Sequence, residues 1–257
     1  MPEIKALGVT KIFSGKQEIT ALADINLTIK NGEFVSILGP SGCGKSTLLE
    51  IIAGLQVPSS GKILLDGEPV TQPLLELGVV FQDSALYPWR TVLENIELGP
   101  ELRGVPKRER REIAEKYIQM VKLDGFEQKY PSQLSGGMRQ RAGLARTLAN
   151  NPQILLMDEP FGAVDHLTRL QLQDDLLEIC RKEQKTVIFI THDVPEGVFL
   201  GDRVILLTPR PGRIQKILTV PVQKPRRRED PALIAIHDTI YRLIYATSDE
   251  TDLEYIL

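Results

Sequence analysis

The chain lacks most of the features that mark secreted and membrane-spanning proteins. It has only two cysteines, Cys43 and Cys180, in 257 residues, too few for a disulfide framework and typical of a reducing compartment. Its wholly apolar runs, such as Val187–Ile190, are only a few residues long, which excludes a transmembrane helix. The first residues contain no basic segment followed by an apolar one, so we expect no secretory signal.

The chain also lacks a large excess of charge of either sign. Lys and Arg total 31 against 34 for Asp and Glu, so no global positive field draws the protein onto nucleic acid, and we expect no nucleic-acid partner. Hydrophobic residues make up 42% of the chain, as in ordinary globular proteins. A chain of this length forms one large α/β domain, or one domain with an inserted lobe.

What the chain does contain is a phosphate-binding loop. Residues 39–46 read GPSGCGKS and fit the pattern G-x-x-x-x-G-K-[ST]. The apolar run 34–38 before it predicts a buried strand, and residues 47–53 after it predict a helix that stops at Gly54. Such a turn directs backbone N–H groups and the positive end of the helix dipole at phosphate oxygens. The predicted nucleotide-binding residues are Gly39, Pro40, Ser41, Gly42, Cys43, Gly44, Lys45, Ser46 and Thr47.

Two side chains of this loop carry specific chemistry. Lys45 supplies a positive charge for the β- and γ-phosphates, and the Ser46 hydroxyl is placed to bind Mg²⁺. Cys43 has no partnered base nearby in the sequence and is interpreted as a small filler. The alternative is a glycine loop that only turns the chain, and the flanking strand and helix disfavour it.

The order of the other segments predicts the fold. Residues 4–38 resemble antiparallel β structure, with Asn31-Gly32 as a hairpin turn into the next strand. Residues from about 84 to 152 are helical in character, and strands then alternate with a helix, which indicates a parallel sheet. The expected fold class is therefore α/β: a P-loop nucleoside triphosphatase core with a mainly parallel sheet, an N-terminal antiparallel β subdomain and an inserted helical subdomain at about 84–152.

The C-terminal part of the sequence predicts a linker and a helix. Residues 221–231 read as a linker that leads into a short amphipathic helix around Ala232–Ala246. The basic run 224–228 within it is interpreted as solvated. Contact with lipid headgroups is the alternative.

Two adjacent carboxylates follow the predicted strand 154–157. Asp158 stands at the end of a parallel strand, where a carboxylate beside the phosphate loop can hold Mg²⁺. Glu159, one residue later, can reach the water that attacks the γ-phosphate and is the predicted general base. The alternative is an acidic strand end without a catalytic role.

A second anion-binding helix start follows the motif Ser135-Gly136-Gly137. Exposed N–H groups and the serine hydroxyl form a donor set at the beginning of a helix. Because the chain carries one phosphate loop, this cap is expected to serve the nucleotide of another copy. A serine N-cap with glycines kept for the turn alone is the alternative.

In order and spacing, these motifs resemble the ATPase subunits of ABC transporters. The resemblance covers roughly residues 1–220, which it implies are an ABC-type ATPase domain followed by a linker and short helix at 221–257. It is carried by the phosphate loop, Gln82, Leu134–Gln140, Ile154–Pro160 and Thr191–Asp193. Segments 86–92, 161–165 and 209–214 further resemble the importers of nitrate, taurine and other alkanesulfonates.

The resemblance implies roles for residues whose chemistry alone is ambiguous. Gln82 would touch Mg²⁺ or the attacking water, and His192 would contact the γ-phosphate and help to hold Glu159. Phe13 would stack on adenine, with a core or turn role as the alternative. Each of these residues would be unremarkable without the neighbouring motifs.

The resemblance also implies two surfaces. Ser135, Gly136, Gly137 and Asp165 would contact the nucleotide of a second subunit, and Val164 stands where the family usually has leucine. Residues 84–92 would receive the membrane partner, with Tyr87 and Trp89 as exposed anchors and ordinary burial as the competing account.

The expected function is ATP hydrolysis, with ATP and Mg²⁺ as cofactors, that powers import of a small solute. The expected partners are a second copy or a similar ATPase subunit, an integral membrane permease and, indirectly, a periplasmic or lipid-anchored substrate-binding protein. Such a protein would be peripheral, on the cytoplasmic face of the membrane. The alternatives are an ABC-type ATPase that works as a mechanical scaffold and a small-molecule kinase, although a kinase does not explain Ser135–Gly137.

Overall fold

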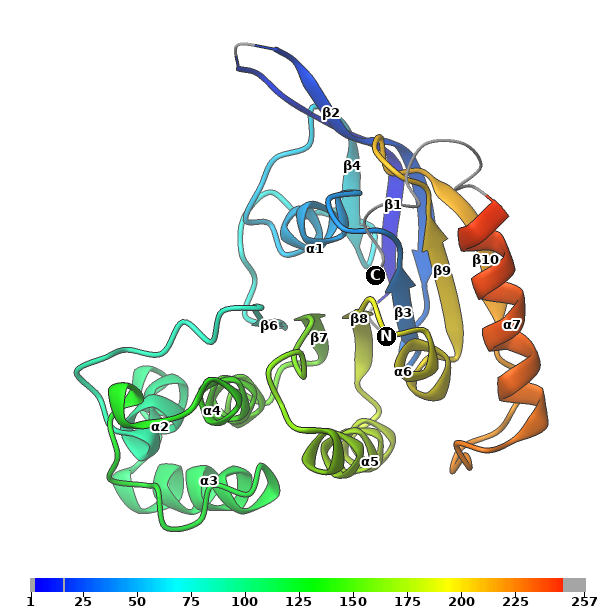
Figure 1. Cartoon of the computed structure of the whole chain (residues 1–257). Coiled ribbons are helices and arrows are strands. Elements are labelled where there is room, and N and C mark those ends of the chain that lie inside the picture. The colour runs from blue at the N-terminus through cyan, green and yellow to red at the C-terminus, as the bar shows by residue number, and fades with distance from the viewer. Residues whose placement is uncertain (1–2, 16, 247–257) are drawn as a thin grey trace. The chain divides into compact units, whose positions relative to one another are not determined.

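The computed structural model describes residues 3–15 and 17–246, and the chain divides into two compact units (Figure 1). The first unit comprises Met1–Pro73 and Ile188–Leu257, and the second comprises Leu74–Val187. Across the described ranges, no helix has both the length and the apolar character needed to cross a membrane.

A four-stranded sheet occupies the N-terminal part of the first unit, with strand order β2-β1-β4-β5. Strand β1 pairs antiparallel with both β2 and β4. The second half of β2 alternates buried and exposed residues, as expected for a sheet with one covered face. The bounds are β1 Ile4–Phe13, β2 Ile19–Ile29, β4 Ser60–Leu65 and β5 Glu68–Pro69.

The first unit also contributes strands to a second sheet, in the order β10-β9-β3-β8. Strand β3 is parallel to β9, and β10 pairs antiparallel with β9 at the edge. All five residues of β3 are buried, because strands in the parallel part of a sheet are covered on both faces. The bounds are β3 Phe34–Leu38, β8 Thr186–Ile190, β9 Arg203–Leu207 and β10 Ile214–Thr219, and the division between the units falls within β8.

One sequence expectation about these strands is wrong. The turn at Asn31-Gly32 does not close a hairpin, because β2 pairs with β1 in one sheet whereas β3 pairs with β9 in the other. The turn therefore connects two sheets, and Phe34–Leu38 is not part of the antiparallel structure. The physical reason is burial. A strand with five consecutive buried residues needs cover on both faces, which the half-exposed N-terminal sheet does not provide.

In the described part of the first unit, three helices accompany these sheets: α1 Lys45–Ile52, α6 Val194–Leu200 and α7 Pro231–Ala246. Helix α7 runs beside β10 (Figure 1), and the Gln215 side chain on β10 donates a hydrogen bond to the Leu243 carbonyl. Leu233 and Ile240 of α7 are fully buried. The expected C-terminal amphipathic helix is thus present, while residues 247–257 of the predicted segment lie outside the described residues.

The interpretation of the basic run 224–228 as solvated is wrong at Arg226, although Arg227 in the same run is exposed. Arg226 is only 8% exposed, and its guanidinium donates hydrogen bonds to carbonyls at the end of α6 and beyond. Lys224 forms a 2.8 Å ion pair with Asp202, and Arg228 lies 3.8 Å above the ring of Phe199. The carbonyls that accept from Arg226 are those of Val198, Phe199, Gly201, Val220 and Val222. Since the last carbonyls of a helix have no partner within it, a buried donor group here satisfies them.

We predict that Arg226→Ala lowers the free energy of unfolding by about 2–3 kcal/mol, because several buried carbonyls lose their donor. Urea denaturation at pH 7 measures this change. The matched control is Arg227→Ala, whose neighbouring side chain is exposed, and it should alter stability by less than about 0.5 kcal/mol. Equal losses in the two variants would contradict the assigned role of Arg226.

The second unit combines strands with a helical region. Strands β6 and β7 are parallel, and helices α2, α3 and α4 pack against one another (green in Figure 1). The bounds are β6 Leu77–Val80, α2 Val92–Leu102, α3 Lys107–Met120, a 3-10 turn η1 at Pro131–Gln133, α4 Gly136–Ala149, β7 Ile154–Asp158 and α5 His166–Lys182. A mainly parallel sheet, an antiparallel N-terminal sheet and a helical region confirm the predicted fold class.

Candidate nucleotide site

The phosphate loop of the first unit has the backbone geometry of an anion site. Gly42 and Gly44 have φ values of 73° and 102°, a left-handed conformation that glycine adopts without strain. Helix α1 starts directly after Gly44 with no side-chain cap and no acidic residue in its first turn. Its first N–H groups and the positive end of its dipole are therefore left for an anionic ligand.

The side chains of the loop are arranged around this backbone. Lys45 is 7% exposed, and its Nζ donates to the carbonyls of Gly39 at 2.7 Å and Pro40 at 3.0 Å. Ser46 is exposed at the start of α1. Cys43 is buried, and a Cβ built on Gly39 would lie 2.9 Å from its Sγ, so the thiol fills space beneath the loop. Burial raises the pKa of the Cys43 thiol, which suits a packing role rather than a nucleophilic one.

Two further predicted residues belong to the same unit as the loop. The backbone N–H of Thr191 donates to the carbonyl of Ile37, so His192 directly follows a residue bonded to the strand that enters the loop. His192 is exposed. Phe13, at the end of β1, is 39% exposed and has the Lys11 ammonium 5.1 Å from its ring centre. It lies at the surface rather than in the core, as stacking on a base requires.

In the second unit, the two predicted carboxylates lie where the sequence places them. Asp158 is the last residue of β7 and is 8% exposed. Glu159 has φ = 46°, a left-handed conformation that is uncommon for a residue other than glycine, and its carbonyl accepts from the Gly162 N–H. Strained backbone of this kind is concentrated at functional positions, where the surrounding structure holds it in place.

The predicted second anion site is the N-terminus of α4. Ser135 is the N-cap, and its Oγ accepts from the Met138 N–H at 3.2 Å. Both Ser135 and Gly136 are exposed. Gly137 instead packs against the backbone of Ala163, because a Cβ at this position would lie 2.6 Å from the Ala163 carbonyl oxygen. The second glycine is thus needed for packing, while the serine and the first glycine are open to solvent.

Gln140 is a residue to which the sequence reasoning assigned no role. It is 9% exposed, and its Nε2 donates to the Gln82 carbonyl at 3.2 Å while its Oε1 accepts from the Ala163 N–H at 2.8 Å. One amide thereby ties the segment after β6 to the turn that follows Glu159. The sequence feature that could have pointed to this role is the position of Gln140 at the end of the Leu134–Gln140 motif.

Asp165 has a local structural role. It is the N-cap of α5 and accepts from the Thr168 N–H at 3.0 Å, and this hydrogen bond holds the pKa of its carboxyl below the usual value. Val164 before it is 4% exposed, which fits an apolar position that tolerates valine in place of leucine. Leu167, two residues after the cap, is 77% exposed.

The segment 84–92 presents aromatic side chains on a braced backbone. Trp89 is 70% exposed and Tyr87 is 40% exposed, and their ring centroids lie 5.3 Å apart. The fully buried Asn95 accepts from the Tyr87 N–H and donates to the Arg90 carbonyl, while Arg146 donates to the Ala85 carbonyl. Ordinary burial of the two rings, the competing account, is therefore wrong.

The predicted site residues fall into two groups. The first unit holds Phe13, residues 39–47 and His192, and the second holds Gln82, Ser135–Gly137, Asp158, Glu159 and Asp165. Among the described residues, no group of three or more His, Cys, Asp or Glu side chains forms a metal cluster. Ser46 in the first unit carries a hydroxyl and Asp158 in the second carries a carboxylate, and each is a hard oxygen donor of the kind that Mg²⁺ takes.

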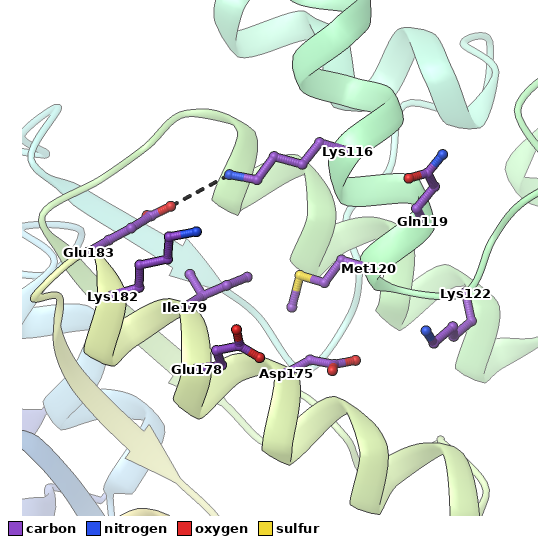
Figure 2. Close-up of a pocket in the computed structure, with 9 residues that line it drawn as sticks. All are labelled: Lys116, Gln119, Met120, Lys122, Asp175, Glu178, Ile179, Lys182 and Glu183. Carbon is purple, nitrogen blue, oxygen red and sulfur yellow. Dashed lines mark ion pairs between the residues drawn. The ribbon is translucent and has the colours of Figure 1, made fainter.

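A cavity of about 410 Å³ in the second unit lies between α3 and α5, and none of the predicted site residues lines it (Figure 2). Met120 and Ile179 contribute apolar surface, and Lys116 pairs with Glu183 at 3.6 Å. The remaining lining residues are Gln119, Lys122, Asp175, Glu178 and Lys182. With three lysines and three acidic residues, the cavity has no charge preference and no assigned chemistry.

Comparison with known proteins identifies related sequences over most of the chain. Residues 22–162 match the family model described as ABC transporter. An uncharacterised ABC transporter ATP-binding protein of Methanocaldococcus jannaschii is 56% identical over 88% of this chain and 85% of its own. The taurine import ATP-binding protein TauB of Yersinia pestis is 50% identical over 83% of this chain and 84% of its own. The bicarbonate transport ATP-binding protein CmpC of Synechococcus elongatus is 49% identical over 90% of this chain and 35% of its own.

Solved structures agree with the sequence matches. A dimeric bacterial ABC transporter cassette has a TM-score of 0.78 and 38% identity, covering 86% of this chain and 100% of its own. A post-hydrolysis state of that cassette, bound to ADP and Pi, has a TM-score of 0.77 and 36% identity over the same shares.

Proposed function

Because the chain belongs to the ABC transporter family, we propose that it is the ATPase subunit that powers import of a small solute through a separate membrane permease. It binds ATP and hydrolyses it for transport. The observation that carries the import assignment is sequence identity to ATP-binding proteins of importers. The chain is 50% identical to the taurine protein over 83% of its length and 49% identical to the bicarbonate protein over 90% of its length. The proposed solute is of the same class: taurine, another alkanesulfonate, nitrate, bicarbonate or a similar small molecule.

The residues divide the work of phosphoryl transfer. Lys45 and the uncapped N-terminus of α1 bind the phosphates and neutralise their charge. Ser46 and Asp158, with Gln82, would hold Mg²⁺, which supplies further charge neutralisation at the transferred phosphoryl group. Glu159 accepts a proton from the attacking water.

Two more side chains complete each proposed site from the same copy. His192 contacts the γ-phosphate and orients Glu159, and Phe13 stacks on the adenine with its exposed ring. Positioning of this kind supplies most of the catalysis, since phosphoryl transfer needs little covalent help from the protein.

The other wall of each site comes from a second copy in this proposal. Ser135, Gly136 and Gly137 of one copy would cover the γ-phosphate held by its partner, with Asp165 beside them on the same interface. The exposed serine and first glycine of α4 support this role, because a helix start that faces solvent offers its donors to an incoming anion. The dimeric state of the similar solved cassette also supports it. Closure around ATP would exclude water and strengthen the electrostatics at the γ-phosphate.

Segment 84–92 would connect hydrolysis to the permease at the cytoplasmic face of the membrane. Exposed aromatic side chains with little freedom are effective anchors at interfaces, and Tyr87 and Trp89 stand on backbone that Asn95 and Arg146 hold. Gln140 donates to the Gln82 carbonyl two residues before this segment, so a change at the α4 N-terminus can be transmitted to it. A substrate-binding protein would deliver the solute to the permease.

A complementation experiment tests the proposal. In a strain that lacks this gene, uptake of one radiolabelled small solute among taurine, alkanesulfonates, nitrate and bicarbonate should be lost and be restored by the wild-type chain.

We predict that Trp89→Glu fails to restore uptake and no longer co-purifies with the permease, because a charge replaces the anchor. The ATPase rate of the purified variant should stay within about twofold of the wild type, since the substitution is on the surface.

The matched control is Leu102→Glu, which places the same charge at another exposed apolar residue of the second unit, 79% exposed. It should restore uptake fully. Normal uptake of all the tested solutes in the deletion strain would overturn the import assignment, and full uptake with Trp89→Glu would overturn the docking surface.

A further inference from the structure

The turn that joins β9 to β10 reaches the phosphate loop from a distant part of the sequence. The Nε and Nη2 atoms of Arg210 both donate to the carbonyl oxygen of Gly42, at 3.1 Å and 3.0 Å. Arg210 belongs to the segment 209–214, which the motifs of ATP hydrolysis do not include. Both residues lie in the first unit.

The backbone that carries Arg210 is held firmly. Thr208 closes the turn, because its Oγ1 donates to the Pro211 carbonyl and accepts from the Arg213 N–H. Gly212 is wedged between two neighbours: its N–H donates to the Ala21 carbonyl, and a Cβ there would lie 2.1 Å from the carbonyl oxygen of Cys43. The turn therefore packs directly under the phosphate loop.

Other parts of the phosphate loop are braced by packing. A Cβ on Gly39 would lie 3.2 Å from Leu207, and one on Gly44 would lie 2.8 Å from Leu22. Gly42 is exposed and left-handed, and a glycine loses more backbone freedom than any other residue when its conformation is fixed. The two hydrogen bonds from the Arg210 guanidinium hold the loop at this point.

We propose that Arg210 is a nucleotide-positioning residue that fixes the phosphate loop through the Gly42 carbonyl and so lowers the cost of ordering the loop around the β-phosphate. Fixing that carbonyl also fixes the peptide unit to which it belongs, so the loop is already ordered when its N–H groups bind the ligand. The guanidinium also adds positive charge at the loop. Burial raises the pKa of the Cys43 thiol there, whereas the charges of Lys45 and Arg210 lower it. The inference rests on the proposed assignment of residues 39–47 as the ATP site.

Binding of a fluorescent nucleotide, displaced by ATP, ADP or AMP, tests the inference on the full-length chain. Arg210→Ala should lower the affinity for ATP and for ADP by the same factor, about tenfold, because two charge-assisted hydrogen bonds are lost. The affinity for AMP should not change. In steady-state assays KM should rise by a similar factor while kcat changes little, and the melting temperature without nucleotide should stay the same. Arg210→Lys keeps the charge but lacks the two planar N–H donors of the guanidinium, so its nucleotide affinity should lie between that of Arg210→Ala and that of the wild type.

The matched control is Arg213→Ala, an exposed arginine in the same turn, which should bind all three nucleotides like the wild type. Wild-type affinity of Arg210→Ala for ATP and ADP would overturn the inference, as would a loss confined to ATP, which would indicate direct contact with the γ-phosphate. If the wild-type chain itself bound no ATP, the assignment of the loop would fail instead, so the two failures are distinguishable.

Discussion

Glu159→Gln lowers the rate of ATP hydrolysis by about 10³-fold and leaves ATP bound, because an amide cannot accept the proton of the attacking water. The substitution keeps the size of the side chain, and the Glu159 carbonyl still accepts from the Gly162 N–H, so the left-handed turn after β7 is preserved. With hydrolysis blocked, two copies should stay closed around ATP. A coupled ATPase assay and gel filtration with ATP and Mg²⁺ measure the two effects.

The control is Glu115→Gln, which makes the same chemical change on the exposed face of α3, where Glu115 pairs with Arg111 at 3.0 Å. Surface ion pairs contribute little, so this variant should keep its turnover and elute as the wild type does. Near-normal hydrolysis by Glu159→Gln, or elution as a monomer with ATP, would show that the general base lies elsewhere.

The strands of the parallel sheet were the most predictable part of the fold. The ranges 34–38 and 154–157 were expected as strands and are observed as β3 and, with one more residue, as β7. All of their residues are buried, and an apolar run that is bounded by polar residues and covered on both faces can be recognised without knowing its neighbours.

Pairing between strands was less predictable than the strands themselves. Asn31-Gly32 correctly marks a turn, but the sequence of a turn describes local backbone and not the partner of the next strand. The hydrogen bonds of β3 go to β9, far along the chain, because that sheet buries both faces of the strand. Long-range burial overrode a strong local signal.

The prediction that the basic run 224–228 is solvated failed at Arg226 for a related reason. Prolines and arginines together predict exposure, yet Arg226 is buried because the last carbonyls of α6 need donors. Gln140 and Arg210 were missed as partners in the same way. Each binds backbone groups of segments distant in sequence, at Gln82 and Ala163 for the first and at Gly42 for the second. A motif records which residue types occur, whereas these contacts depend on which carbonyls and N–H groups the fold brings to them.

Ser135→Arg should reduce ATP turnover by about 10²-fold while each monomer still binds ATP with normal affinity. In the proposed dimer this serine covers the nucleotide of the partner, so a bulky cation there obstructs closure without disturbing the phosphate loop of its own chain. The hydrogen bond from the Met138 N–H is lost as well, which should cost only about 1 kcal/mol of stability. Ser132→Arg is the matched control, since Ser132 is also exposed and lies in η1 just before this cap.

Mixing two inactive variants separates a shared site from a site within one chain. Ser135→Arg keeps an intact phosphate loop, and Lys45→Ala keeps an intact α4 cap, so a mixed dimer contains one complete site only if each site combines the loop of one copy with the cap of the other. Turnover should therefore reappear on mixing, although each variant alone is inactive. If every site were built from a single chain, neither copy would hold both elements and the mixture would stay inactive, which would refute the two-copy mechanism even if both single variants behaved as expected.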